Sequence, residues 1–238
     1  MSERNIVKQS YLLNNSKYKL SAISMDIIMG LISELKNEDS EFSIIRIKIS
    51  ELEKKINKRI DKRYLRRLSF ELLSPDIEIN LEHGGFLRSA WFSSFEYNPQ
   101  SNFLELSFDP KLKPYLLELK NNFALGYLSE ITLLNSEYSK RIYMLLRQRS
   151  NIGKYEISLK DLQEILKVPK SYLVYKVFKK RVLVPTIENI NSKTTMNITL
   201  NEIKKLRKVE FLEFKIKAEK IKKTKLKDFE LEFLEGEK

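Results

Sequence analysis

The sequence predicts an α+β fold made of two tandem winged-helix domains, each a helix-turn-helix followed by a β-hairpin wing. The order of elements predicts this fold. The series of helix, strand, helix, helix and β-hairpin is expected twice along the 238 residues. The composition agrees with it. Only six Gly and six Pro interrupt the chain, as in a helix-rich protein, and a hydrophobic share of 42% is enough to fill a core.

The first half supplies the first set of elements. They are a helix over 18–36, a strand over 42–49, a helix opened by a capping box of Ser50 and Glu53, a helix over 61–73, and strand-like runs over 77–81, 86–97 and 103–108. Apolar residues recur at helical spacing in the helices, whereas the strands alternate and are rich in β-branched residues. Segment 109–137 reads as a helical connector.

The second half repeats the order. Its elements are a helix over 138–149, a strand over 155–157, a helix opened by the cap pair Ser158 and Asp161, a helix from Ser171 through Arg181, and a two-stranded wing over 195–200 and 208–216. The last helix can continue past Pro185 to Ile190 with a kink. The similarity between the halves is one of architecture and not of repeated sequence.

Positive charge is concentrated in the second half. The chain carries 44 Lys and Arg against 32 Asp and Glu, a net charge of +12. Counting along the sequence, residues 1–122 have a net charge of +2 and residues 123–238 have +10. Two windows are strongly basic, 46–67 and 140–181. A basic window is often a solvated helix face, but two of them in similar runs of elements indicate a polyanion such as DNA.

The second helix of a helix-turn-helix enters the major groove, so its outward side chains are the candidate DNA contacts. At 100° per residue, the helix after Pro169 places four side chains on one arc: Tyr172, Lys176, Lys179 and Lys180. Val174, Phe178 and Val182 lie on the opposite arc and are expected to face the core. Arg181 is expected to rotate toward the apolar side, and to contact a phosphate from the edge or pair with an acid such as Glu188.

The same construction on helix 61–73 places Leu65, Leu68 and Leu72 inward. Four cations project outward: Lys62, Arg63, Arg66 and Arg67. Arg holds guanine through two hydrogen bonds, whereas Lys acts mainly as a point charge. For both helices the alternative is a solvated face that only confers solubility.

Four segments of the second half carry a family resemblance. SEYSKRIYMLLRQ, YEISLKDLQEILKV, YLVYKVFKKRVLVPTIENINSKT and IKKLRKVEFLEFKI occur in this order and resemble the initiator replication proteins of iteron-containing bacterial plasmids. The segment LELSFDPKLKPYLLELKNNFALGYL resembles the family's passage between its two domains. The resemblance covers residues 10–217, and 138–216 is its specific part. One departure is Leu206, where a Gly is expected before Arg207 in the wing turn.

The resemblance implies binding to repeated origin sites (iterons) in double-stranded DNA, origin opening and recruitment of host replication proteins. It places Lys179, Lys180 and Arg181 in the basic cluster of the C-terminal recognition helix. We expect an N-terminal domain over 1–122 with DNA contacts and dimerisation, a C-terminal domain over 123–217 with the main iteron-binding surface, and a charged tail over 218–238. The expected location is the bacterial cytoplasm, on the plasmid.

The sequence offers no candidate for catalysis, a metal or a cofactor. It has no Cys, which excludes disulfides and thiolate metal sites, and its one histidine, His83, lies in a predicted turn. One His cannot form the paired-histidine metal site of a rolling-circle nicking enzyme. The pattern G-x-x-x-x-G-K of P-loop ATPases does not occur. Neither an apolar span of membrane length nor a signal-peptide pattern at MSERNIVKQS is found.

Three functions remain to be distinguished. The leading interpretation is a plasmid initiator that binds iterons as a monomer and represses its own promoter as a dimer. The second is a winged-helix transcriptional repressor without origin activity, for which a lone palindrome in the flanking DNA would be evidence. The third is a rolling-circle nicking initiator, which the single histidine disfavours.

Overall fold

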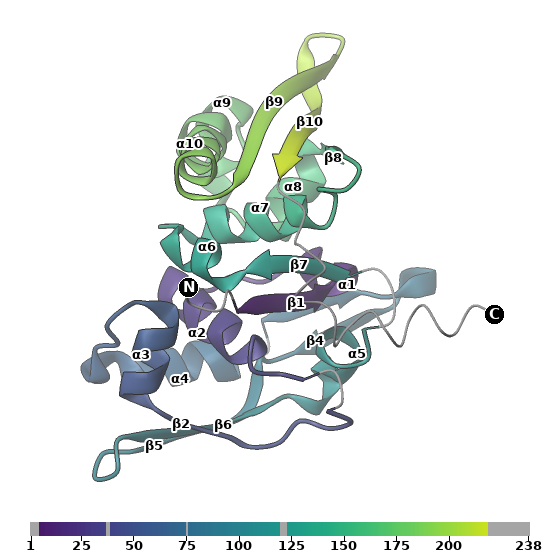
Figure 1. Ribbon diagram of the computed structural model, residues 1–238. Coiled ribbons are helices and arrows are strands. Elements are labelled where there is room, and N and C mark those ends of the chain that lie inside the picture. The colour runs from purple at the N-terminus through teal and green to yellow at the C-terminus, as the bar shows by residue number, and fades with distance from the viewer. Residues whose placement is uncertain (1–4, 37–38, 75, 120–122, 219–238) are drawn as a thin grey trace, which may run out of the picture.

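The two predicted winged-helix domains lie one above the other in the computed structural model, which describes residues 5–36, 39–74, 76–119 and 123–218 (Figure 1). The predicted charged tail lies outside the described residues, apart from Ala218 at the end of the last strand. Among the described residues, no helix is long and apolar enough to cross a membrane.

After a short strand and a short helix that the sequence did not predict, the elements of the N-terminal domain follow the predicted order. They are β1 (Ile6–Ser10), α1 (Tyr11–Asn14), α2 (Ala22–Ile32), β2 (Ile45–Lys48), α3 (Ile49–Ile56), a 3₁₀ turn (Lys62–Tyr64), α4 (Leu65–Leu73), β3 (Ile77–Asn80), β4 (Phe86–Ser89), β5 (Phe92–Asn98) and β6 (Phe103–Phe108). The predicted inward residues Leu65, Leu68 and Leu72 are buried. The wing is the hairpin β5–β6, and β2 extends it to a three-stranded sheet in the order β2-β6-β5.

Two helix starts differ from the sequence prediction. Helix α2 begins four residues later than predicted because the chain before it is extended: Lys17 exchanges two backbone hydrogen bonds with Glu78 (2.8 and 2.9 Å), and the Ser21 side chain then caps the helix. Helix α3 begins directly at the end of β2, with Lys48 as its N-cap residue. The capping role predicted for Ser50 is therefore wrong, and Glu51 instead accepts from the Lys48 backbone N–H at 3.4 Å.

The predicted single strand over 86–97 is two strands in two sheets. Strand β4 pairs with β3 in a separate hairpin, whereas β5 pairs with β6 in the wing. The chain changes sheets at Trp91, whose backbone N–H donates to the Leu72 carbonyl at 3.2 Å. The Trp91 ring is buried edge-on against Tyr18, so packing between elements and not local propensity breaks the strand.

The predicted helical connector contains a strand. A 3₁₀ turn (Pro110–Leu112) and the short helix α5 (Lys113–Leu116) lead to β7 (Phe123–Tyr127) and α6 (Leu128–Leu133). Strand β7 pairs antiparallel with β1, for which the sequence predicted no element, so that Lys8 lies opposite Leu125. The two domains are therefore joined through a two-stranded sheet in the middle of the molecule (Figure 1).

The C-terminal domain repeats the order. Its elements are α7 (Glu137–Arg147), β8 (Lys154–Ser158), α8 (Leu159–Ile165), a 3₁₀ turn (Lys170–Tyr172), α9 (Tyr175–Phe178), a π-helical segment (Lys179–Leu183), α10 (Val184–Lys193), β9 (Met196–Lys205) and β10 (Lys208–Ala218). The predicted cap is confirmed, because the Ser158 hydroxyl oxygen accepts from the Asp161 N–H at 3.0 Å. The sheet order is β8-β10-β9.

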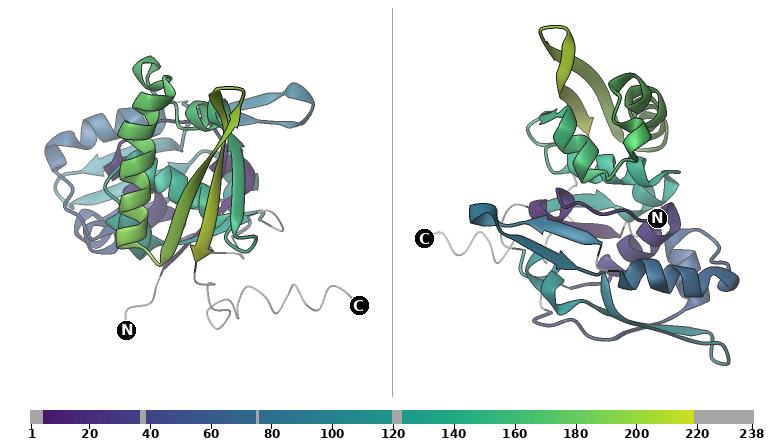
Figure 2. Two further views of the ribbon diagram at one scale, coloured as in Figure 1. Left: turned by 90° about the horizontal axis from the view of Figure 1, so that it is seen from above. Right: turned by 180° about the vertical axis from the view of Figure 1, so that it is seen from behind.

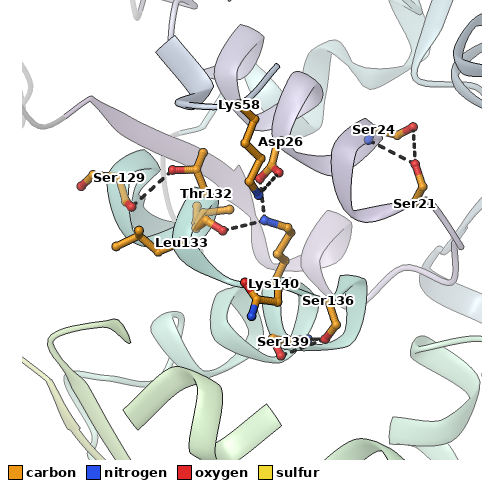
Figure 3. A network of polar contacts seen from close by, with 12 residues as sticks. Ser21, Ser24, Asp26, Lys58, Ser129, Thr132, Leu133, Ser136, Ser139 and Lys140 are labelled. Carbon is orange, nitrogen blue, oxygen red and sulfur yellow. Dashed lines mark hydrogen bonds and ion pairs between the residues drawn. The ribbon is translucent and has the colours of Figure 1, made fainter. Parts of the chain in front are cut away.

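Buried charges connect α7 with the N-terminal half of the chain. The Lys140 ammonium of α7 lies 2.5 Å from the Asp26 carboxylate of α2, and both side chains are fully buried (Figure 3). Lys58 donates to the other oxygen of Asp26 at 2.5 Å, and Lys140 also donates to the Ile131 carbonyl at 2.7 Å. The guanidinium of Arg141 stacks on the Tyr18 ring, 3.4 Å from its centroid. These contacts hold α7 against α2 and the segment before it.

Candidate nucleic-acid interface

The C-terminal recognition helix begins later than the sequence predicts. Its first residue is Tyr175 and not Ser171, because residues 170–172 form a 3₁₀ turn after Pro169. The side-chain amide of Gln163 on α8 donates to the carbonyls of Tyr172 (3.3 Å) and Leu173 (3.0 Å). These carbonyls would otherwise accept bonds within a longer helix, so a contact from the preceding helix sets the start.

The predicted DNA-facing arc is formed in part. Lys176, Lys179 and Lys180 are exposed, and the opposite residues Phe178 and Val182 are buried, as predicted. Tyr172 lies in the turn before the helix and packs partly buried against the core, so it does not share the helical arc. Val174 precedes the helix and is 63% exposed, so its predicted inward position is wrong.

The helix passes Pro185 through a wider turn. Residues Lys179–Leu183 are π-helical, and α10 continues the helix to Lys193. Proline lacks an N–H, and its ring collides with the carbonyl four residues earlier, here that of Arg181. A π turn adds room at this point and shifts the following side chains around the axis. Arg181 is consequently exposed and forms no ion pair with Glu188 or any other described residue, contrary to the predicted rotation toward the apolar side.

One of the lysines ties the recognition helix to the wing. The Lys179 ammonium lies 2.6 Å from a carboxylate oxygen of Glu202 on β9. This hydrogen bond lowers the pKa of Glu202. The charge of Lys179 is thus partly compensated inside the protein, whereas Lys176 and Lys180 have no ion-pair partner among the described residues.

The tip of the second wing is a further basic surface, outside the residues predicted to contact DNA. The hairpin β9–β10 projects beyond the helices of its domain (Figures 1 and 2). Its tip has four exposed cations: Lys204, Lys205, Arg207 and Lys208. Leu206 lies among them, 97% exposed, with a positive φ of 58°. The segment KKLRK contains four cations in five residues, a pattern typical of nucleic-acid contacts, and this pattern could have identified the wing.

In the N-terminal domain the predicted cations are also exposed. Lys62 and Arg63 lie in the 3₁₀ turn, and Arg66 and Arg67 lie on α4. Arg63 forms a two-pronged ion pair with Asp61, with N–O distances of 3.0 and 2.6 Å, which lowers the pKa of the Asp61 carboxyl. Arg66 and Arg67 are the cations of this helix that lack such a partner among the described residues.

The two wings differ in charge. The tip of the first wing, residues 98–102, contains no charged side chain. Glu96 and Glu105 lie opposite each other just before it, and Arg46 of β2 pairs with Glu105 at 3.0 Å. The tip of the first wing therefore has no cation for a phosphate backbone, unlike the tip of the second. In the described ranges, no three His, Cys, Asp or Glu side chains are grouped so that they could hold a metal ion.

Two winged-helix domains with exposed basic recognition helices define a class of DNA-binding protein. Family comparison identifies the members of this class to which the chain is related. The model of the Initiator Replication protein WH1 domain matches residues 6–147, and that of the Initiator Rep protein WH2 domain matches residues 158–216. The chain belongs to the initiator replication protein family, as the sequence resemblance implied.

Similar proteins include two replication proteins and one solved complex. The chain is 27% identical over 176 residues to a probable replication protein rep of Bifidobacterium longum (strain NCC 2705), covering 70% of this chain and 57% of that protein. It is 30% identical over 157 residues to the PI protein of Escherichia coli, covering 58% of this chain and 51% of the relative. It thus spans little more than half the length of these relatives.

The fold is that of a solved initiator. The crystal structure of the Pi initiator protein in complex with iteron DNA matches with a TM-score of 0.71 at 19% identity, over 92% of this chain and 100% of that one. This match confirms the predicted architecture of two tandem winged helices.

Proposed function

We propose that this protein is a plasmid replication initiator that binds repeated origin sequences in double-stranded DNA, promotes opening of the origin and recruits host replication proteins. Membership of the initiator family supports this role. The similar fold of the Pi initiator protein, which was solved in complex with iteron DNA, also supports it. Its place of action is the bacterial cytoplasm, on the plasmid.

The observation that carries the proposal is the basic surface of the C-terminal domain. Exposed Lys176, Lys180 and Arg181 of the recognition helix lie beside a wing whose tip has four exposed cations. A helix in the major groove and a hairpin over the adjacent backbone would grip one site from two sides. The C-terminal domain is therefore the main iteron-binding unit in this proposal.

The N-terminal domain takes a supporting role. Arg66 and Arg67 add contacts to DNA, and the first wing, whose tip has no charged side chain, leaves the sheet β2-β6-β5 available for pairing with a second copy. An unpaired sheet edge is a template for such pairing. In this proposal the protein binds DNA without cutting it, as a binding protein and not an enzyme.

Footprinting on the DNA that flanks the gene tests the proposal. We expect protection of several direct repeats beside an AT-rich stretch. Protection of a single palindrome would instead indicate a transcriptional repressor. Absence of sequence-specific protection anywhere in the flanking DNA would reject both functions.

A further inference from the structure

The tip of the second wing combines three features that folding alone does not require. Leu206 is 97% exposed, so its side chain contributes nothing to the core. Its φ of 58° lies in the left-handed region, which a leucine adopts at an energetic cost and glycine or asparagine adopts more readily. Four exposed cations surround it in sequence. A strained, exposed apolar residue in a basic hairpin tip indicates a role in binding.

The position of the tip is fixed relative to the recognition helix. Lys179 of the helix is held to Glu202 of β9 at 2.6 Å, and Leu206 follows Glu202 by four residues. At about 3.3 Å per residue, the tip extends roughly 13 Å beyond this ion pair. In B-DNA a major groove is followed by a minor groove about half a helical turn away, roughly 17 Å along the axis. With the helix in the major groove, an extension of this size is comparable to the spacing between the two grooves.

We propose that Leu206 is an apolar wedge that the β9–β10 hairpin inserts into the minor groove beside each repeat, where it unstacks one base step. This inference rests on the proposed DNA-binding function. Lys204, Lys205, Arg207 and Lys208 bind the phosphates of the two strands that border the groove. Apolar side chains inserted between base steps kink the duplex toward the major groove. Each bound copy thus weakens base stacking at the edge of its site, which assists opening of an origin.

The test uses full-length protein and a duplex that contains one footprinted repeat, with 2-aminopurine placed in turn at each step of the flanking minor groove. Two variants remove the wedge but suit a positive φ: Leu206→Gly and Leu206→Asn. The matched control is Ile152→Ala, since Ile152 is also an exposed aliphatic residue of this domain (66%). It lies at the opposite end of the hairpin from the tip, because the neighbouring Gly153 carbonyl accepts from the Ile216 N–H of β10.

We expect wild-type protein and the control to raise 2-aminopurine fluorescence at one step and to bend the duplex in a circular-permutation gel assay. Both Leu206 variants should lose the fluorescence rise and at least half of the bend, with affinity about tenfold weaker because the unstacked contact is lost. Their Tm should be equal to or above that of the wild type, because the left-handed residue is no longer a leucine. A higher Tm together with weaker bending is an outcome that a purely structural role of Leu206 does not produce.

Three results would overturn the wedge. The first is full fluorescence and bending in both Leu206 variants while the wild type still binds repeats, which leaves the proposed function standing. The second is Leu206-dependent binding to phosphatidylglycerol vesicles with no effect on DNA, which would assign the basic apolar tip to a membrane surface. The third is a wild-type protein that binds no repeat, which rejects the proposed function and the wedge with it.

Discussion

At the scale of single residues, the ion pair between Asp26 and Lys140 has both of its side chains fully buried. Burial raises the pKa of Asp26 and lowers the pKa of Lys140 to about 8, because both groups lose contact with water. Lys58 shares the same carboxylate, so two cations depend on one acid. A buried pair contributes little net stability, but removing one partner leaves an uncompensated charge in the interior.

We therefore expect Asp26→Ala to destabilise the protein by about 3–5 kcal/mol, because Lys140 stays buried without its carboxylate. The double variant Asp26→Leu with Lys140→Met should recover most of this loss, since both fully buried charges are then removed and the remaining cation, Lys58, has a side chain that is 33% exposed. Urea denaturation of both variants measures the effect, with Glu188→Ala at an exposed position as the control. A double variant as unstable as the single one would show that lost packing, and not the buried charge, is the cause.

At the scale of elements, the two recognition helices present different sets of uncompensated cations. The C-terminal helix presents Lys176, Lys180 and Arg181, while Lys179 is held by Glu202. The N-terminal helix presents Arg66 and Arg67, while Arg63 is held by Asp61. The C-terminal helix lies beside a basic wing tip, whereas the wing tip of the N-terminal domain is uncharged. We therefore expect the C-terminal unit to carry more of the site-specific affinity.

Replacing Lys179 and Lys180 by Ala should weaken binding to a repeat by several kcal/mol if both reach bases, since each good base contact discriminates by about 1–3 kcal/mol. Replacing Arg66 and Arg67 by Ala should cost more general affinity and less specificity. Fluorescence anisotropy with repeat and scrambled duplexes separates the two effects. Lys180→Ala alone is the cleaner variant, because loss of Lys179 also frees Glu202.

Thermal unfolding is the control for these variants, and exposed positions should leave the Tm unchanged. The opposite result is that the folded Lys179/Lys180 variant binds like the wild type, while the Arg66/Arg67 variant loses discrimination between repeat and scrambled duplexes. That result would assign the main recognition surface to the N-terminal domain.

Two of the confirmed predictions depend on local sequence. The cap of Ser158 on α8 and the inward leucines of α4 follow from residues three or four positions apart, and the structure confirms both. Strand β1 was missed because its partner β7 lies far along the chain. The late start of α9 was missed because Gln163 on another helix determines it. For the site, the sequence predicted the exposed lysines of the helix and the existence of the wing, but not the cations of the wing tip as part of the site, because the position of the wing beside the helix depends on tertiary pairing.

At the scale of the whole molecule, the proposed function separates DNA binding from DNA chemistry. Supercoiled plasmid incubated with the protein and Mg²⁺ or Mn²⁺ should stay supercoiled, with no product linked to a tyrosine, because the one histidine of the chain cannot supply a paired-histidine metal site. Agarose gel electrophoresis detects a single nick per plasmid. Protein-dependent nicking that disappears with one Tyr→Phe substitution would instead establish a rolling-circle enzyme.

The charge of the whole molecule makes binding dependent on salt. Most of the net charge of +12 lies in the second half, where the recognition helix and the wing tip present exposed cations. Each neutralised phosphate releases counterions, so log affinity should fall linearly with log salt, with a slope near −5 or steeper for about six or more contacts.

Lys204→Ala with Lys208→Ala should reduce the slope by about 2, one for each lost phosphate, at repeat and scrambled sites alike. Lys111→Ala, an exposed lysine of the connector, is the matched control and should leave the slope unchanged. An equal change with Lys111→Ala would show that net charge and not the wing surface governs binding. A flat salt dependence of the wild type would show that neutralisation of phosphates does not drive binding at all.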